Sequence, residues 1–251
     1  MRRYVMQIEY DGSHYAGFQL QPDMPSIQGE LEKALGGLYK VPVRVHPSGR
    51  TDAGVHALAQ IVHFDAPREL RDLNLKAAMN RLLPRDIRVL RSGRTDTSFH
   101  ARFSARKRTY RYTISTRETA LDRDRVWQIF RSLDFPALQE SAAVFEGEHD
   151  FTAFCSAQAE VKHKYCRIYR SFWEHEQDRY TYYIEGNRFL HSMVRSLTGT
   201  MVEVAKGRLE VRDLRRILES RSRSGDAVTA PPQGLFLLRV EYEFPLPWEL
   251  T

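Results

Sequence analysis

The stretch "SGRTDAGVHA", residues Ser48 to Ala57, places a single acid between two segments with the composition of β-strands. Asp52 follows Arg50 by two residues, and Gly49 and Gly54 bracket the pair. A loop between two strands lies at an end of a sheet, where active sites are often built. Arg50 would keep a partly desolvated Asp52 carboxylate ionised, and such a carboxylate can act as a nucleophile or general base. An ordinary Asx turn with a surface ion pair fits the same residues, so their spacing leaves both interpretations open.

The pattern around this loop predicts a β-α-β-β-α-β order for the first half of the chain. Alternating or β-branched apolar residues predict strands at 5–10, 42–46, 59–64 and 87–90. Ser26 can cap a helix with one apolar face, and a second helix is predicted to open at Asp72 and to stop at Pro84.

The second half of the chain repeats this order with one extra helix. Strands are predicted at 110–114, 167–174, 180–185 and 234–244, and helices at 135–145, 190–206 and 211–219. Gly207 follows the long helix in the position that favours a left-handed residue. The two halves therefore suggest an α+β protein built from two split-βαβ units, 1–104 and 105–251, although no residue-level repeat relates them.

Composition indicates a folded protein with a modest excess of positive charge. The chain has 251 residues, of which 42% are apolar, and a formal net charge of +6. Two basic clusters are evident, and the second is interleaved with aromatic residues: Arg102, Arg106, Lys107, Arg108 and Arg111; Lys162, His163, Lys164, Tyr165, Arg167, Tyr169 and Arg170. Such clusters suit RNA, with its phosphates and stackable bases, but solvated strand faces would look the same.

Several classes of protein find no support in the sequence. Two cysteines, Cys155 and Cys166, are too few for a disulfide scaffold or a zinc site. The first residues read as a strand and not as a signal peptide, and no apolar run approaches the length of a membrane span, so we expect a reducing cytosol. The stretch "KALGGLYK" lacks the context of a phosphate-binding loop, and the histidines lack metal-ligand spacing.

Six stretches in order resemble the tRNA pseudouridine synthase A family. They are "YDGSHYAGFQLQ" (10–21), "SGRTDAGVHA" (48–57), "FHARFSA" (99–105), "RTYRYTI" (108–114), "GEHDFTAF" (147–154) and "GNRFLHSMVRSLTGTMVEVAKG" (186–207). The resemblance runs along nearly the whole chain. Phe18 departs from it, because the family generally has Trp there, and 156–164 have no clear counterpart.

The resemblance implies isomerisation of uridine to pseudouridine in the anticodon stem-loop of tRNA, at tRNA positions 38, 39 or 40. It assigns Asp52 as the nucleophile, Tyr110 as the platform on which the target base stacks, and Arg195 as the buried partner of the aspartate. It assigns Arg50 to displacing or replacing the flipped base. It further implies no metal or other cofactor, a homodimer that holds tRNA, and one extended, mostly antiparallel sheet with helices on one side and a basic cleft at its centre.

Two other functions remain open from the residues themselves. A non-catalytic RNA-binding protein of tandem RRM-like units would use the same basic strands and aromatics, but it gives no reason for Asp52 and lacks an RNP-type signature. A small-molecule isomerase would leave the basic clusters unexplained. Tyr110 could also simply pack in a sheet beside Tyr112, and Arg195 could be a solvated helix position.

Overall fold

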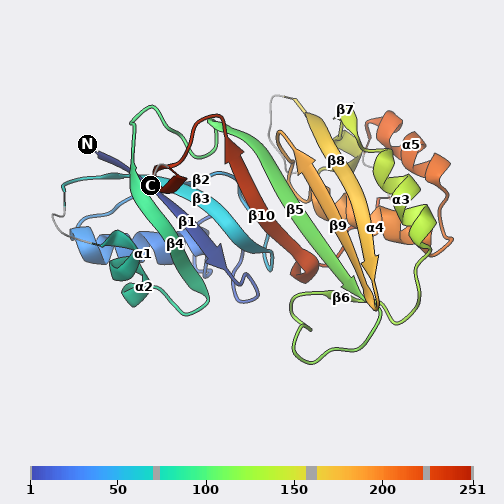
Figure 1. Ribbon diagram of the computed structural model, residues 1–251, viewed down its shortest axis with the longest axis horizontal. Helices are drawn as coiled ribbons and strands as arrows, with labels where there is room; N and C mark the ends of the chain where they lie inside the picture. Colours follow the sequence, from blue (N-terminus) through green and yellow to red (C-terminus); the bar gives the residue numbers. More distant parts are fainter. Residues whose placement is uncertain (1, 70–73, 157–162, 223–226, 250–251) are drawn as a thin grey trace. The chain divides into compact units, whose positions relative to one another are not determined.

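Figure 1 shows the computed structural model, which describes residues 2–69, 74–156, 163–222 and 227–249. The mixed α+β class is confirmed. Contacts divide the chain into two compact units: unit 1 comprises Met1–Arg106 and Leu237–Thr251, and unit 2 comprises Lys107–Phe236. This division differs from the predicted halves because the C-terminal segment lies with unit 1. The predicted sharing of one sheet with a central cleft concerns the placement of the two units, and it stays a prediction.

Where the structure describes it, unit 1 contains antiparallel strands, two α-helices and one short 3-10 helix. Its elements are β1 (Arg2–Tyr10), α1 (Ile27–Tyr39), β2 (Val45–Pro47), β3 (His56–Ala66), α2 (Leu75–Leu82), β4 (Ile87–Thr95), the last six residues of β10 (Leu235–Tyr242) and the short helix η3 (Pro247–Glu249). Strand β1 pairs with β3 on one side and with β4 on the other, and β2 pairs with β3. The elements follow the predicted order, with a shorter β2 than expected.

Local signals determine where the helices of unit 1 begin. The Ser26 hydroxyl accepts a hydrogen bond from the Gly29 N–H at 3.2 Å, as predicted for the cap of α1. Helix α2 begins later than predicted, because Asn74 caps it by accepting from the Ala77 N–H at 3.1 Å. The predicted cap, Asp72, lies outside the described residues.

The C-terminal segment belongs to unit 1 because its aromatic and charged side chains pack there. The Tyr242 hydroxyl donates to the Ala101 carbonyl at 2.8 Å, and the rings of Phe99 and Tyr242 lie 5.1 Å apart. Arg106 forms an ion pair with Glu243. These contacts join residues about 140 positions apart in sequence, which a pattern of local periodicity does not reveal.

Unit 2 combines mostly antiparallel strands with three α-helices in the described chain. Its elements are β5 (Ala105–Ser115), β6 (Trp127–Gln128), α3 (Phe135–Ala143), β7 (Gly147–Asp150), η1 (Thr152–Phe154), β8 (Tyr165–Glu176), β9 (Arg179–Gly186), α4 (Met193–Ala205), α5 (Val211–Ser220) and η2 (Pro232–Gly234). Strand β9 pairs with β5 and β8, and β7 extends the sheet from β8. Strands β6 and β7 were not predicted, because two and four residues are too few to show alternation.

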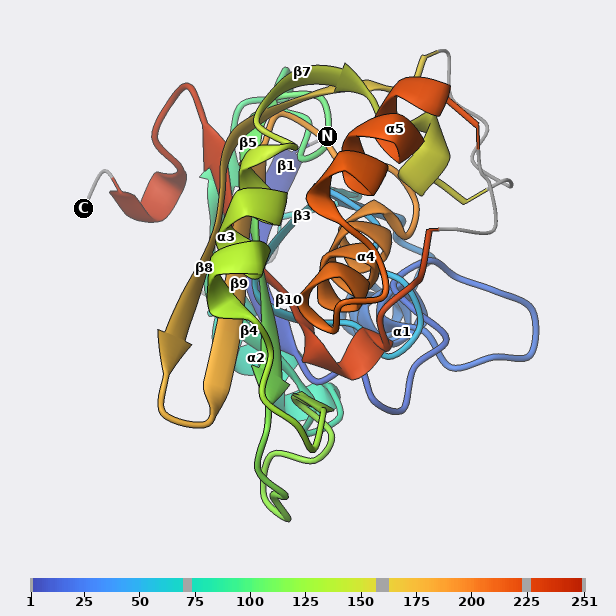
Figure 2. The ribbon, with the colours of Figure 1, turned by 90° about the vertical axis from the view of Figure 1, so that its right-hand side faces the viewer.

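Helix α4 is the most buried helix of unit 2 and packs with α3 and α5 (Figure 2). The Trp173 indole N–H on β8 contacts the Met201 sulfur of α4 at 3.4 Å, which joins helix and sheet. Gly207 has a φ of 71° directly after α4, as predicted for a helix terminator. Within the described residues, no helix has the length and apolar character needed to cross a membrane.

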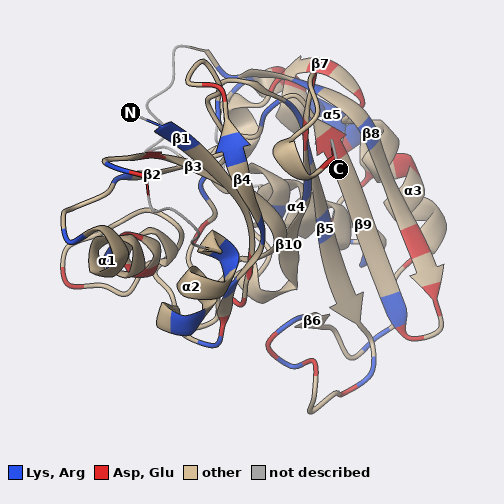
Figure 3. Ribbon diagram, turned by 60° about the vertical axis from the view of Figure 1, so that its left-hand side comes forward, with Lys and Arg blue, Asp and Glu red and all other residues tan. Residues whose placement is uncertain are grey.

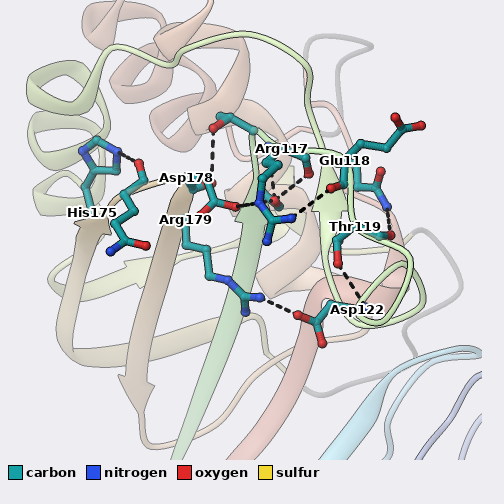
Figure 4. Close-up of polar contacts among 11 residues, drawn as sticks. Arg117, Glu118, Thr119, Asp122, His175, Asp178 and Arg179 are labelled. Carbon is teal, nitrogen blue, oxygen red and sulfur yellow. Dashed lines mark hydrogen bonds and ion pairs between the residues drawn. The ribbon is translucent and has the colours of Figure 1, made fainter.

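A long connection between β5 and β6 is tied to the turn between β8 and β9 (Figure 4). The Arg117 Nε donates to the Asp178 carboxylate at 3.2 Å, and the Thr116 N–H donates to the Asp178 carbonyl at 2.8 Å. Arg179 forms an ion pair with Asp122 further along the connection. These bonds attach the beginning and the middle of the connection to one hairpin.

A buried histidine in unit 1 is held neutral by its surroundings. The His63 Nδ1 accepts the Ala101 N–H at 3.1 Å, and the His63 ring lies 4.9 Å from His46 and 4.5 Å from His100. Burial, followed by the charges that His100 and His46 would carry, lowers the pKa of His63 to about 3. Protonation of His63 therefore opposes folding of unit 1.

His63 should make stability pH-dependent in a defined window. The folded pKa lies below the unfolded value of about 6.5, so the stabilisation is present above pH ~6.5 and is lost as pH falls toward 3. Between pH 7 and pH 5 the unfolding free energy of the wild type should fall by about 2 kcal/mol more than that of a His63→Asn variant. The variant is a suitable control because its amide oxygen can still accept the Ala101 N–H. Urea unfolding at both pH values measures this, and parallel losses in the two proteins would contradict it.

Candidate active site

The loop between β2 and β3 alternates buried and accessible residues. Ser48 and Thr51 are buried at 1% and 7% exposure. Arg50, between them, is exposed, and Asp52 is half-buried. The Asp52 carbonyl accepts the Val55 N–H at 3.2 Å in a tight turn. This bond forms a backbone turn that begins at Asp52, whose side chain is only partly removed from solvent.

A second loop, residues 11–18, packs backbone on backbone against this one. The Phe18 N–H donates to the Thr51 carbonyl at 3.0 Å. Gly17 has a φ of 103°, and a Cβ there would lie 2.8 Å from the Thr51 carbonyl oxygen. A Cβ at Gly12 would lie 2.1 Å from the Val55 carbonyl oxygen. The glycines are thus required for the approach, and they join the first two stretches of the family resemblance into one local structure.

Phe18 fills its place in this structure although the family generally has Trp there. Its side chain is fully buried, with its ring 6.3 Å from that of Tyr10. Nearby, the His56 Nδ1 lies 3.1 Å from the Gly12 nitrogen and 3.2 Å from an Asp11 carboxylate oxygen. The predicted structural role of His56 fits these contacts.

Two buried polar side chains bond to the Asp52 loop and were not singled out from the sequence. They are Tyr10, at the end of β1, and Gln60, on β3. Alternation along β1 does place Tyr10 on the same face as Met6 and Ile8, so its burial could have been predicted. The hydrogen bonds of Gln60 could not, because a glutamine in a strand is usually solvated.

Tyr110 lies on β5 in unit 2, opposite Ile184 of β9. It is buried at 7% exposure, and its ring meets that of Phe189 edge to face at 5.1 Å. Tyr112 shares its face of the strand, and the Tyr112 hydroxyl donates to the Pro231 carbonyl at 2.8 Å. Tyr110 therefore does pack in the sheet on the same face as Tyr112, and its ring also contacts Phe189 of the "GNRFLHS" stretch.

Arg195 lies in the first turn of α4 and is half-buried, so it is not a solvated helix position. Its Nε donates to the Ala230 carbonyl at 2.9 Å, and its own carbonyl accepts the Ala230 N–H at 3.0 Å. Burial raises the pKa of Tyr112, while the positive charge of Arg195 opposes that rise. Arg195 is thus close to the strand face that also carries Tyr110.

The predicted site residues fall into two pairs. Arg50 and Asp52 share one loop of unit 1, and Tyr110 and Arg195 flank one strand face of unit 2. Each pair is positioned by several backbone hydrogen bonds. Convergence of the two pairs on one substrate stays a prediction.

Three residues of the first basic cluster have partners from distant parts of the sequence, and two of these partners are acids. Arg106 pairs with Glu243, and the Lys107 ammonium lies 3.0 Å from a Glu185 oxygen. Arg108 is buried at 8% exposure and donates to the Asn187 carbonyl at 2.8 Å. These side chains therefore have structural roles that the basic run by itself did not indicate.

An exposed aromatic ring of the second basic cluster lies beside one cation from each cluster. Tyr169 on β8 is 40% exposed, with the Lys107 ammonium 5.1 Å and the Arg167 guanidinium 6.0 Å from its ring centre. Basic residues occupy the first half of β8 and acidic residues its end (Figure 3). The loop 157–162, which includes Lys162, lies outside the described residues.

Comparison with known proteins agrees with the resemblance. A family model described as tRNA pseudouridine synthase matches residues 6–104 and 142–243. Among curated relatives named "tRNA pseudouridine synthase A", that of Afipia carboxidovorans is 42% identical over 245 residues, covering 96% of this chain and all of the relative. That of Anoxybacillus flavithermus is 41% identical over 97% of this chain and all of the relative. That of Oceanobacillus iheyensis is 39% identical over 97% and 98% of the two chains.

A solved structure, "Crystal Structure of a Cbf5-Nop10-Gar1 Complex", contains a chain that overlaps 94% of this one and 58% of its own length. Its TM-score of 0.38 and identity of 10% are too low for an argument from fold. The family model and the curated relatives cover most of the sequence and are specific. The chain therefore belongs to the tRNA pseudouridine synthase family.

Proposed function

We propose that this chain converts uridine to pseudouridine in the anticodon stem-loop of tRNA, with Asp52 as the nucleophile. As a family member it is an isomerase that acts on tRNA. The observation that supports the role of Asp52 is the construction of its loop, in which buried residues on either side hold a half-buried carboxylate on a fixed backbone. A surface turn without function needs no such support.

The chemistry requires a nucleophile and no change of oxidation state. The bond between the sugar and the uracil nitrogen breaks, the uracil turns in the site, and its carbon 5 bonds to the sugar. The proton on carbon 5 leaves to a base, and the released nitrogen gains a proton, so substrate and product contain the same atoms. The Asp52 carboxylate supplies the electron pair for a covalent intermediate, which exists after the first glycosidic bond has broken and before the second has formed.

The residues of unit 2 supply binding and electrostatics in this proposal. Tyr110 offers a ring for the extruded uracil, which returns about 1–3 kcal/mol of stacking against an extrusion cost of a few kcal/mol. Arg195, held by Ala230, is the assigned partner of the Asp52 carboxylate. Arg50 is exposed beside Asp52 and is assigned to the space that the flipped base leaves.

The cations around Tyr169 are the described groups best suited to the phosphate backbone of tRNA. Arg167 is exposed, and Tyr169 offers an adjacent stacking surface. We also propose that the enzyme acts in the cytoplasm as a homodimer, as the family resemblance implies.

Asp52→Asn should abolish turnover and leave tRNA affinity nearly unchanged, because an amide has the same shape but is not an anionic nucleophile. Release of tritium from tRNA labelled at carbon 5 of uracil measures the reaction. Asp23→Asn is a matched control, since Asp23 is exposed and has a left-handed φ of 56° that asparagine adopts readily. Residual activity of Asp52→Asn, with deamidation excluded by mass spectrometry, would refute the assignment. Tight tRNA binding without tritium release by the wild type would favour an RNA-binding protein.

Tyr110 variants should separate stacking from proton transfer. Tyr110→Ala should lose about 1–3 kcal/mol of base-holding energy with the ring. If the hydroxyl also removes the proton from carbon 5, Tyr110→Phe should slow by about 10²–10⁴ and accumulate an enzyme-bound intermediate. We expect this slower Tyr110→Phe reaction in single-turnover kinetics with enzyme in excess. An Ala variant as fast as the wild type would show that Tyr110 only packs in the sheet.

Arg167→Gln should weaken binding of different tRNAs alike and flatten the dependence of log affinity on log salt by about 0.9, as expected for one lost phosphate contact. Filter binding across a salt series provides the slope. Arg81→Gln, on the exposed side of α2, is the control and should leave the slope unchanged. Equal slopes for wild type and Arg167→Gln would show that Arg167 is solvated surface.

A further inference from the structure

We propose that Tyr10 and Gln60 are positioning residues that fix the Asp52 loop in its reactive geometry from beneath. The inference rests on the proposed role of Asp52 and extends it to two side chains that are not themselves in reach of a substrate. Both are almost completely buried, at 3% and 0% exposure, so any effect on the reaction must pass through the residues that they contact.

Gln60 holds the beginning of the loop. Its Oε1 accepts a hydrogen bond from the Ser48 hydroxyl at 2.5 Å, and its Nε2 donates to the Gly49 carbonyl at 2.8 Å. The Ser48 N–H also donates to the Ile61 carbonyl at 2.7 Å. One amide group thus bonds to two successive loop residues from the middle of β3.

Tyr10 holds the residue next to the nucleophile. Its hydroxyl lies 2.8 Å from the Thr51 Oγ1. Burial raises the pKa of Tyr10 to about 12, so the hydroxyl stays protonated throughout the physiological range. Because the Thr51 carbonyl accepts from the Phe18 N–H, Thr51 is held at both its side chain and its backbone.

The three hydrogen-bonded loop residues fix the backbone from which the two charged side chains extend. Ser48, Gly49 and Thr51 are bonded to the interior, whereas Arg50 is exposed and Asp52 half-buried. A nucleophile must be held within about 0.5 Å of its productive position, and a displacement of about 1 Å can cost about 10²-fold in rate. The hydrogen bonds of Tyr10 and Gln60 to the loop are well suited to this task because both side chains are almost completely buried and are shielded from competing water.

A purely structural role predicts lost stability without a specific loss of rate, and Asn80 provides the matched comparison. The Asn80 amide makes two hydrogen bonds in unit 1, donating to the Val89 carbonyl at 2.9 Å and accepting the Val89 N–H at 2.7 Å. It joins α2 to β4 and makes no hydrogen bond to the loop. Asn80→Leu and Gln60→Met therefore each remove two hydrogen bonds of an amide while keeping much of the side-chain volume.

The experiment compares Tyr10→Phe, Gln60→Met and Asn80→Leu in single-turnover assays with saturating enzyme, well below each thermal midpoint. We expect Tyr10→Phe to slow the reaction by about 10-fold and Gln60→Met by about 10²-fold, with tRNA dissociation constants within about twofold of the wild type. Asn80→Leu should lose thermal stability and keep its rate. Full rates for Tyr10→Phe and Gln60→Met, or equal losses in Asn80→Leu, would overturn the proposal.

Thr51 gives a milder test should Gln60→Met fail to fold. Thr51→Ser keeps the hydroxyl partner of Tyr10 and should retain most of the rate, whereas the isosteric Thr51→Val should match Tyr10→Phe. Combining Tyr10→Phe with Thr51→Val should add little, because both remove the same hydrogen bond. Additive losses would show that the bond does not act as a unit and would overturn this part of the proposal.

The pH dependence of the rate distinguishes a positioning role from proton transfer. The activity of the wild type distinguishes failure of this proposal from failure of the proposed function. Loss of positioning should lower the rate at every pH without moving the apparent pKa values of the profile. A profile that shifts in Tyr10→Phe would assign Tyr10 to proton transfer instead. An inactive wild type would contradict the proposed function, while an active wild type, an inactive Asp52→Asn and fully active Tyr10 and Gln60 variants would contradict only the positioning role.

Discussion

The packing of two loop backbones in unit 1 is the constraint on which the candidate site depends. Loop 11–18 approaches loop 48–55 so closely that a Cβ at Gly12 would lie 2.1 Å from a carbonyl oxygen. No side chain can be accommodated there without moving one of the loops. The approach brings the Phe18 N–H to the Thr51 carbonyl and covers the buried side of the Asp52 turn. The position of Asp52 is thus a consequence of contacts made on the opposite side of its own backbone.

In unit 2, too, contacts with backbone atoms fix the position of a candidate site residue. Two hydrogen bonds with Ala230 orient Arg195, one through its side chain and one through its backbone. Tyr112 bonds the next residue, Pro231, from the face of β5 that carries Tyr110. Backbone carbonyls are strong acceptors at fixed positions, so they can orient a guanidinium without neutralising it.

Much of this arrangement could be predicted from the sequence because its signals are local. The Ser26 cap, the apolar face of α1 and the glycine after α4 each depend on residues within a few positions, and the structure contains all three. The family resemblance then assigned roles to Asp52 and Tyr110 that periodicity could not. Where local signals were absent or ambiguous, prediction failed. Strands β6 and β7 are too short to alternate, and α2 begins at Leu75, after the cap Asn74, and not at the expected residue.

The interactions that the sequence did not reveal are those between distant residues. A basic run such as 106–108 looks like a binding surface, yet Glu243 and Glu185 neutralise part of it and Arg108 is buried. Gln60 reads as a solvated strand residue, yet it is fully buried because loop carbonyls and hydroxyls satisfy its amide. Burying an amide is unfavourable unless both its donor and its acceptor are bonded. The loop and Gln60 therefore depend on each other, since the loop makes the burial tolerable and the buried amide limits the conformations that the loop can adopt.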